Sequence, residues 1–317
     1  MLRSLFYSAL ALFASSLAHA DLFVSSFTQN SVRRYDEATG NFLGTFIAAG
    51  SGGLSAPHRA LFGPDGAFYV ASANNDRILR YDGVTGAFLG IFASAPQLDY
   101  PVDMLWGPDG NLYVSSQLND SIVRFNGSTG AFIDVFVPSG SGGLGGPSGI
   151  QFFGSDLFVA GRFSNAAYRY DGLTGAFELE IGTGVLPTAF GLDFGPDGNL
   201  YVASGGGQRV MKFNPISGAN LGTFVASGSG GLSGAIGAEF GTTGQLYVAS
   251  FNTDSIKAYD GTTGAYLADR VAAGSGGLDS PNYFTVAVPE PATIALLGCA
   301  MGSMALRRRR TSAESRE

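Results

Sequence analysis

Short apolar segments alternate with turns rich in glycine, asparagine and aspartate along most of the chain. In one stretch, apolar segments at 57–62, 67–71, 77–81 and 87–92 are separated by polar turns. The first of these turns is Gly63-Pro64-Asp65-Gly66, in which proline presets φ and glycine accepts a positive φ. Segments of this length joined by tight turns predict an antiparallel sheet of four strands.

This four-strand pattern recurs six times. The valine of the second segment returns at intervals of 46, 44, 45, 43 and 46 residues, and an aromatic residue and a turn glycine that follow it keep the same intervals. A fixed period of this length is typical of a solenoid or a propeller. The recurring positions are Val24, Val70, Val114, Val159, Val202 and Val248; Tyr35, Tyr81, Phe125, Tyr170, Phe213 and Tyr259; Gly40, Gly86, Gly130, Gly175, Gly218 and Gly264.

The phase of the repeats favours a closed ring. After residue 20 the chain begins with the second strand of a repeat, at Leu22, and the last repeat segment, 281–286, is a first strand. This last strand is expected to complete the first sheet, which pairs the two ends and leaves no open edge. The sequence therefore predicts an all-β, six-bladed β-propeller of four-stranded antiparallel blades over residues 21–288.

The segment FGPDGAFYVASANNDRILRYD, residues 62–82, resembles NHL-type repeats. The wider group that it resembles is the six-bladed propellers that include gluconolactonase-like and regucalcin-like proteins, over residues 21–288. The YDGVTGAF turns at 81–88 are also similar to quinoprotein propeller repeats, which shape blades without by themselves binding a quinone. The resemblance implies the fold, but not one function, because this fold carries lactonases, lyases and binding modules.

Residues 1–20 have the three parts of a secretory signal peptide. Arg3 supplies the positive charge, residues 5–17 are apolar, and Ala18-His19-Ala20 fits the small-residue cleavage rule. We expect cleavage between Ala20 and Asp21. The alternative, a membrane anchor, is disfavoured because the apolar run is short for a membrane span.

Residues 289–317 form a second three-part signal. Pro289-Glu290-Pro291 precedes an apolar run at 292–306, and the cluster Arg307, Arg308, Arg309 and Arg310 follows it. This order resembles the PEP-CTERM sorting signal, which implies processing by an exosortase, transient anchoring in the inner membrane and release to the cell surface or an exopolysaccharide matrix. The arginines would stay in the cytoplasm, so residues 21–288 would face the periplasm. An ordinary C-terminal membrane helix is the alternative, but 15 residues rise only about 22 Å.

Charge and rare residues exclude several classes of function. Residues 21–288 contain 12 Lys or Arg and 22 Asp or Glu, an acidic balance that argues against nucleic acid as a partner. The only cysteine is Cys299 and the only histidines are His19 and His58, so a zinc site of the Cys/His type cannot be built.

Two kinds of recurring loop carry polar groups. The sequence Gly-Ser-Gly-Gly-Leu occurs at 50–54, 140–144, 228–232 and 274–278, without the lysine and helix of a phosphate-binding loop, and is interpreted as a connector between blades or as an adaptable binding rim.

Asparagine, aspartate and glutamine recur between the second and third strands. They are interpreted as turn formers or as a polyhydroxyl-binding or calcium-binding face. These residues are Asn30, Asn74, Asn75, Asp76, Asn119, Asp120, Asn165, Gln208, Asn252 and Asp254.

The six first strands differ at their third position. Three successive blades have glycine there, at Gly149, Gly191 and Gly237, whereas the other three have Tyr283, Arg59 and Asp103. One residue earlier lie His58, Val102 and Asn282. Because function in a repeat protein is expected where the repeats differ, the sequence predicts a ligand site at the channel mouth, formed by Arg59, Asp103, Tyr283, His58 and Asn282. A structural Arg59–Asp103 ion pair between neighbouring blades is the alternative interpretation.

Three functions stay open on the sequence alone. The first is a secreted binding module at the cell surface or in the matrix, with extracellular polysaccharide as a partner, no catalytic residues and no cofactor. The second is a divalent-metal lactonase or lyase, with Ca²⁺ or another divalent cation at Asp103 and Asn282, although the inner-strand glutamate of such enzymes has no match because Glu239 lies near the far end of its strand. The third is a structural spacer without a ligand.

Overall fold

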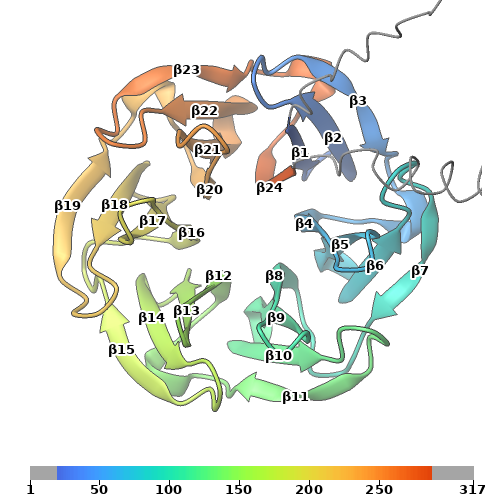
Figure 1. The fold of residues 1–317 in the computed structure, drawn as a ribbon, viewed down its shortest axis with the longest axis horizontal. Coiled ribbons are helices and arrows are strands. Elements are labelled where there is room, and N and C mark those ends of the chain that lie inside the picture. Colours follow the sequence, from blue (N-terminus) through green and yellow to red (C-terminus); the bar gives the residue numbers. More distant parts are fainter. Residues whose placement is uncertain (1–19, 288–317) are drawn as a thin grey trace, which may run out of the picture. The chain divides into compact units, whose positions relative to one another are not determined.

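The computed structural model describes residues 20–287, and the predicted signal peptide up to residue 19 and sorting signal from residue 288 lie outside this range. The described residues form six four-stranded antiparallel sheets arranged as blades around a central channel (Figure 1). The predicted all-β, six-bladed propeller is thereby confirmed. Strands of five to seven residues carry almost all of the regular structure.

From the channel outward, the first blade contains β24 (Pro281–Ala287), β1 (Asp21–Ser26), β2 (Ser31–Asp36) and β3 (Phe42–Ile47). The second contains β4 (Pro57–Phe62), β5 (Phe68–Ser72), β6 (Arg77–Tyr81) and β7 (Phe88–Ala93). The third contains β8 (Pro101–Trp106), β9 (Leu112–Ser116), β10 (Ser121–Phe125) and β11 (Phe132–Val137).

The fourth blade contains β12 (Pro147–Phe153), β13 (Asp156–Gly161), β14 (Ala166–Asp171) and β15 (Phe177–Ile181). The fifth contains β16 (Ala189–Phe194), β17 (Leu200–Ser204), β18 (Arg209–Phe213) and β19 (Asn220–Val225). The sixth contains β20 (Ala235–Phe240), β21 (Leu246–Ser250), β22 (Ser255–Tyr259) and β23 (Tyr266–Val271). Between residues 20 and 287, seven single 3₁₀ turns lie between strands: η1 (Ser51–Gly53), η2 (Ala73–Asn75), η3 (Gln117–Asn119), η4 (Ser141–Gly143), η5 (Ser229–Gly231), η6 (Phe251–Thr253) and η7 (Ser275–Gly277).

The two ends of the ring meet within the first blade. β24 pairs with β1 in an antiparallel register that sets Val24 opposite Phe284 and Asp21 opposite Ala287. This pairing closes the ring as the phase of the repeats predicted, because the last strand of the chain supplies the innermost strand of the first blade (Figure 1).

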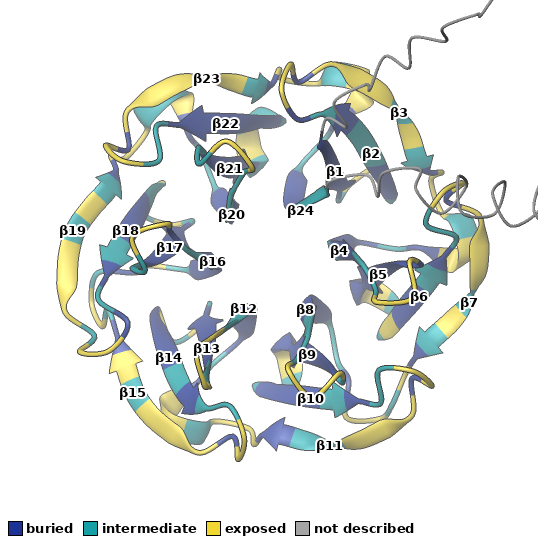
Figure 2. Ribbon diagram, viewed as in Figure 1, coloured by how far each residue is buried: buried dark blue, intermediate teal, exposed yellow. Residues whose placement is uncertain are grey.

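The apolar core lies between blades. Within residues 20–287, a separate cluster of buried side chains fills each of the six contacts between neighbouring blades. Tyr69, for example, packs edge-on against Phe92 of its own blade and Trp106 of the next, with ring centroids 4.8 and 5.2 Å apart. The outermost strands β3, β7, β11, β15, β19 and β23 are the most exposed (Figure 2).

The polar loop residues attach one blade to the next. Asn30, Asp76, Asp120, Asn165, Gln208 and Asp254 all adopt a left-handed backbone conformation. In five of these loops the side chain accepts a hydrogen bond from the backbone N–H just before the next inner strand, as Asp120 does from Gly146 and Asp254 from Ser280. The left-handed backbone fits the turn-forming interpretation, but the side-chain oxygens bond to backbone N–H groups 23–26 residues away rather than within their own turn.

The Gly-Ser-Gly-Gly-Leu connectors pack against the first residue of a neighbouring outer strand. A Cβ atom on Gly142 (φ +64°) would lie 2.1 Å from the Phe177 ring, whereas one on Gly140 (φ +69°) would meet nothing within 4 Å. The same close approach recurs for Gly52 with Phe88, Gly230 with Tyr266 and Gly276 with Phe42.

This pair of glycines gives a matched test of the connector. We expect Gly140→Ala to lower the free energy of unfolding by about 1 kcal/mol, the cost of a left-handed alanine. Gly142→Ala carries the same backbone cost and also displaces the Phe177 ring, so its cost should reach about 2–3 kcal/mol. Urea unfolding of both variants measures the difference, and equal losses would show that the ring contact contributes nothing.

Candidate functional site

All six inner strands have a β-bulge near their start. In β4, Pro57 lies opposite Ser72 and Ala60 opposite Val70, so His58 and Arg59 together oppose a single residue of β5. Equivalent register shifts occur in β8, β12, β16, β20 and β24. From the third position onward alternate residues share a face, so the third and fifth positions of each inner strand lie on the same face of their sheet.

Arg59 crosses the channel rather than pairing only with its neighbour. Its Nη1 lies 2.9 Å from Oε2 of Glu239 on β20 and donates to the carbonyl of Phe284 at 2.8 Å. The predicted pair with Asp103 is also present, with 3.5 Å between Nε and Oδ1. The arginine therefore connects three inner strands, and its shortest carboxylate contact is with a residue that the sequence analysis placed outside the site.

Three carboxylates each link one inner strand to the next. Asp103 accepts from the backbone N–H of Ile150 at 3.0 Å, Asp193 from that of Phe240 at 2.8 Å, and Glu239 from that of Val286 at 3.2 Å. Inner strands of neighbouring blades belong to different sheets, so these N–H groups have no ladder partner. The carboxylates supply acceptors for backbone donors that face the channel.

In the three blades that have glycine at the third position of the inner strand, the backbones of neighbouring inner strands lie very close together. A Cβ atom on Gly149 would lie 2.6 Å from the carbonyl oxygen of Phe190, and one on Gly191 would lie 2.6 Å from that of Ile236. The three glycines thus permit close approach of successive inner strands. The polar side chains of these blades lie two residues further along each inner strand, at Gln151, Asp193 and Glu239.

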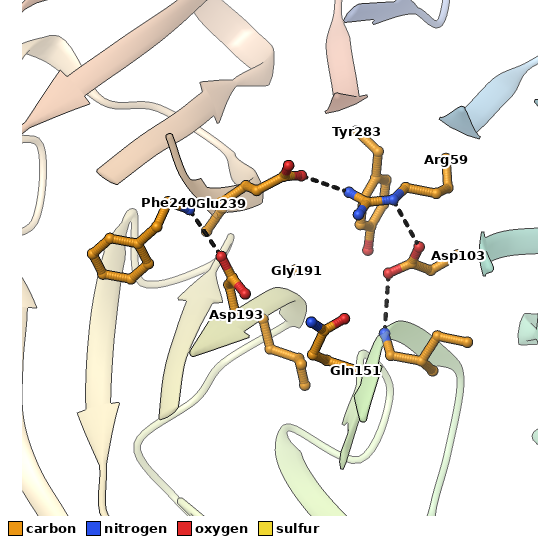
Figure 3. Close-up of a pocket in the computed structure, with 11 residues that line it drawn as sticks. Arg59, Asp103, Gln151, Gly191, Asp193, Glu239, Phe240 and Tyr283 are labelled. Atoms are coloured by element: carbon orange, nitrogen blue, oxygen red, sulfur yellow. Dashed lines mark hydrogen bonds and ion pairs between the residues drawn. The ribbon is translucent and has the colours of Figure 1, made fainter. Parts of the chain in front are cut away.

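A cavity of about 170 Å³ lies in the channel at this level. Asp103, Asp193, Glu239, Arg59 and Tyr283 are its ionisable lining residues, and Gln151 adds a carboxamide (Figure 3). Arg59, Asp103 and Tyr283, which the sequence predicted as site residues, thus line one cavity together. Gly191, Ile150, Leu192, Ala238 and Phe240 complete the lining.

His58 and Asn282 lie outside the lining of this cavity. The Asn282 amide nitrogen is 2.7 Å from His58 Nδ1, and both side chains are buried. The His58 ring is surrounded by the rings of Phe27, Tyr100 and Tyr283, at centroid distances of 5.4, 5.4 and 6.2 Å. The structure therefore separates the five predicted residues into three that line the cavity and two beneath its floor.

The channel is closed at the end where the inner strands begin. Val102, Phe190, Ile236 and Tyr283 form an apolar cluster there. The first two residues of every inner strand are buried, whereas the last residue of each is partly or fully exposed. The cavity is therefore the bottom of a blind pit, and its mouth lies at the far ends of the strands, not at the strand starts that the sequence analysis took for the mouth.

Burial sets the protonation of the pit. Burial raises the pKa of Asp103 to about 6, although Arg59 opposes the rise. Burial and the nearby Glu239 raise the pKa of Asp193 to about 7. Burial works to lower the pKa of Arg59, but Glu239 and Asp103 outweigh it and hold that pKa above its ordinary value. Burial, with Arg162, lowers the pKa of His58 to about 3, so this imidazole is neutral at physiological pH.

These shifts predict how stability depends on pH. Since the folded pKa of Asp193 exceeds the ordinary value of about 4, the folded protein holds a proton that the unfolded chain releases, and stability falls as pH rises through 7. We expect a loss of roughly 1 kcal/mol from Asp193 between pH 6.5 and 8. Below pH 6.5 His58 acts in the opposite sense, because its folded pKa lies under its unfolded value. Urea midpoints measured across pH 6.5–8 test this, and Asp193→Asn should flatten the slope.

Gln151, Asp193 and Glu239 line the cavity but were not predicted as site residues. A signal was available, because residues two apart in a strand face the same side. The fifth positions of the inner strands read Leu61, Leu105, Gln151, Asp193, Glu239 and Thr285. Polar groups thus occupy the fifth position in the blades that have glycine at the third.

No metal-binding cluster is evident in the described part of the chain. Within residues 20–287, no three His, Cys, Asp or Glu side chains come close enough together to hold a metal ion. Instead, Arg59 lies between Asp103 and Glu239. Asp103, Asp193 and Glu239 each accept a hydrogen bond from a backbone N–H group.

A family model for the PEP-CTERM protein-sorting motif matches residues 287–310. The chain carries a PEP-CTERM sorting signal. The prediction from Pro289, Glu290, Pro291 and the four arginines is thereby confirmed, and the motif indicates a secreted, exosortase-processed protein. Within residues 20–287, no helix is long and apolar enough to cross a membrane. No curated protein sequence is significantly similar to this PEP-CTERM protein.

Solved structures share the propeller fold. A chain of a nidogen–laminin complex is 15% identical with a TM-score of 0.68, covering 84% of this chain and 98% of that one. A protein of unknown function from Bacteroides caccae is 13% identical with a TM-score of 0.66, covering 86% and 100%. A streptogramin B lyase is 13% identical with a TM-score of 0.57, covering 80% and 75%. At these identities the similarity establishes the fold alone.

Proposed function

We propose that this PEP-CTERM protein is a binding module of the cell surface or the exopolysaccharide matrix. One observation carries the proposal: the same chain contains a sorting motif at 287–310 and a closed propeller with a blind polar pit. His58, the one histidine among the described residues, is not available for acid–base catalysis, because it is buried and neutral and is hydrogen-bonded to Asn282. Binding needs only the rigid ring and its pit.

The route to the surface follows from the two signals. After cleavage between Ala20 and Asp21, the apolar run 292–306 would hold the protein in the inner membrane with the propeller in the periplasm. At about 22 Å as a helix, this run is short for a hydrocarbon core of roughly 30 Å. An anchor of this kind suits transient attachment followed by cleavage near Pro289-Glu290-Pro291 and release.

Replacing Pro289, Glu290 and Pro291 with alanine tests the route. In a host with an exosortase, we expect the variant to remain in the membrane fraction while the wild-type protein is released. A variant with alanines at Thr311, Ser312 and Ser315, beyond the matched motif, serves as the control and should be released normally. Equal release of all three proteins would contradict exosortase processing.

Extracellular polysaccharide is the proposed partner, and a glycan array probed with the secreted protein tests it. Binding to extracellular glycans supports the proposal. A blank array over acidic and neutral polysaccharides would contradict it and favour a structural spacer.

A metal-dependent lactonase or lyase is the second candidate. The observation in its favour is a cavity with three carboxylates, two of which have raised pKa values. The enzyme requires a divalent cation such as Ca²⁺, whereas the binding module requires none. Metal analysis of the purified protein, together with lactone hydrolysis with and without added Ca²⁺, separates them: bound metal in stoichiometric amount with turnover would favour the enzyme.

A further inference from the structure

Asp193 is a partly buried carboxyl without an ion-pair partner among the described residues. Its two oxygens accept from the backbone N–H groups of Phe194 and Phe240, both at 2.8 Å. Within residues 20–287 it forms no ion pair, because Arg59 is engaged by Glu239 and Asp103. Asp193 lies across the cavity from Arg59 and Asp103 (Figure 3). The pit therefore has three carboxylates but one cationic side chain in its lining.

Tyr283 gives the pit a second group with hydrogen-bonding capacity. The side chain is 1% exposed, lines the cavity and directs its hydroxyl into it, and among the described residues this hydroxyl has at most Ser148 as a hydrogen-bond partner (Figure 3). The nearby Ser148 hydroxyl is directed at the carbonyl oxygens of Ala160, Ala189 and Phe190. A buried hydroxyl can both donate and accept, so the Tyr283 hydroxyl keeps hydrogen-bonding capacity that a ligand with a polar group would use.

The shape of the pit limits the size of a ligand. A volume of about 170 Å³ equals roughly six water volumes and is smaller than the usual pockets for drug-sized molecules. The apolar cluster of Val102, Phe190, Ile236 and Tyr283 closes the inner end, so a polymer cannot thread the channel. Only a small free molecule, or the terminal unit of a polymer, can enter.

We propose that the pit binds a small organic ammonium compound, with the ammonium group at Asp193 beside Glu239 and hydroxyl groups of the ligand at Tyr283 and Gln151. The proposal rests on the proposed binding function and names its ligand class. In a polysaccharide, the matching unit is an amino sugar with a free amine at the end of a chain.

Charge decides between ligand classes. An anionic ligand would meet the three acidic side chains Asp103, Asp193 and Glu239 in a recessed cavity, where repulsion is less screened than at an open surface. A bare metal ion needs several oxygens around one point, and the carboxylates of the described residues do not converge in that way. An ammonium group needs one carboxylate and further acceptors, which Asp193, Glu239 and the Gln151 carbonyl provide. The Gln151 side chain makes no hydrogen bond to the described residues and is free to serve.

Calorimetry on the secreted wild-type protein provides the test, with four probes. Glucosamine carries the ammonium group, N-acetylglucosamine is its uncharged counterpart, glucuronic acid is anionic, and putrescine is an ammonium compound without a sugar ring. We expect glucosamine to bind at least tenfold more tightly than N-acetylglucosamine, and glucuronic acid to show no binding. Putrescine binding as tight as that of glucosamine would identify a free amine as the ligand, whereas weaker binding would favour an amino sugar. Equal affinities for glucosamine and N-acetylglucosamine would overturn the proposal.

Two variants locate the site. Asp193→Asn should weaken glucosamine binding by about ten- to a hundredfold, since it removes one charge-assisted hydrogen bond. Glu180→Gln changes the net charge equally but lies on the exposed outer strand β15, so it should leave the affinity unchanged. Equal effects of the two variants would also overturn the proposal. If Asp193→Asn does not fold, the comparison of glucosamine with N-acetylglucosamine on the wild-type protein still decides.

The two proposals fail in distinguishable ways. A glycan array that shows binding, combined with no preference for the ammonium probes, would leave the binding module intact and overturn the assignment of the pit. A blank array with tight glucosamine binding would contradict polysaccharide as the partner and support the pit.

Discussion

Arg59→Met is expected to lower the free energy of unfolding by about 3 kcal/mol at pH 8, a fall of roughly 6–12 °C in Tm. The variant keeps most of the side-chain volume but leaves Asp103 and Glu239 facing one another in the pit without their cation. Removing one partner of a buried ion pair is costly because the other charge stays desolvated. Thermal unfolding followed by circular dichroism measures the change.

The loss should shrink at lower pH. The pKa of Asp103 is raised to about 6 even with Arg59 present, and removal of the arginine raises it further. Protonation then relieves the unpaired charge, so the stability of the Arg59→Met variant should recover as pH falls from 8 to 5. A deficit that stays constant over this range would contradict an electrostatic cause and indicate lost packing instead.

Two further variants separate charge from position. Arg80→Met removes a comparable ion pair with Asp65, but both side chains are about 40% exposed, so it should cost less than about 1 kcal/mol. Combining Arg59→Met with Glu239→Leu should restore part of the stability, because the unpaired carboxylate is removed with its partner. A double variant less stable than Arg59→Met alone would show that Glu239 matters chiefly through its bond to the Val286 N–H.

The blades could be predicted from the sequence because the residues that specify each strand and turn lie within a few positions of one another. Turn chemistry such as Gly63-Pro64-Asp65-Gly66 and the alternation around Val70 act over a few residues, and six copies reinforce one another. Ring closure also followed from the sequence, since the phase of the repeats leaves one inner strand at the end of the chain. These features require no knowledge of how blades face each other.

The site depends on contacts across the channel, which no local pattern encodes. The long Arg59 side chain reaches Glu239, 180 residues away, because the ring sets β4 and β20 on a common channel. Successive inner strands approach so closely that positions 149, 191 and 237 have no room for a Cβ atom. This approach is a property of the whole ring, and the sequence of a single strand does not reveal it. Reading the fifth position together with the third would have recovered Asp193 and Glu239, but not which of them meets the arginine.

The ring closure gives the largest expected effect. A chain of residues 21–280 lacks β24, so the first blade loses its inner strand and β1 gains an open edge. The lost strand buries Tyr283 and Phe284 almost completely, worth about 1.5–3 kcal/mol each, and its backbone supplies the Phe284 carbonyl to Arg59. Since the whole free energy of unfolding of a protein is about 5–15 kcal/mol, we expect this chain not to form a cooperative fold at 25 °C. The matched control, residues 21–287, keeps β24 and lacks only the sorting signal, and should unfold in one sharp transition by scanning calorimetry. A sharp transition for residues 21–280 would show that five blades and an incomplete sixth suffice, and that closure by β24 serves the pit rather than the stability of the ring.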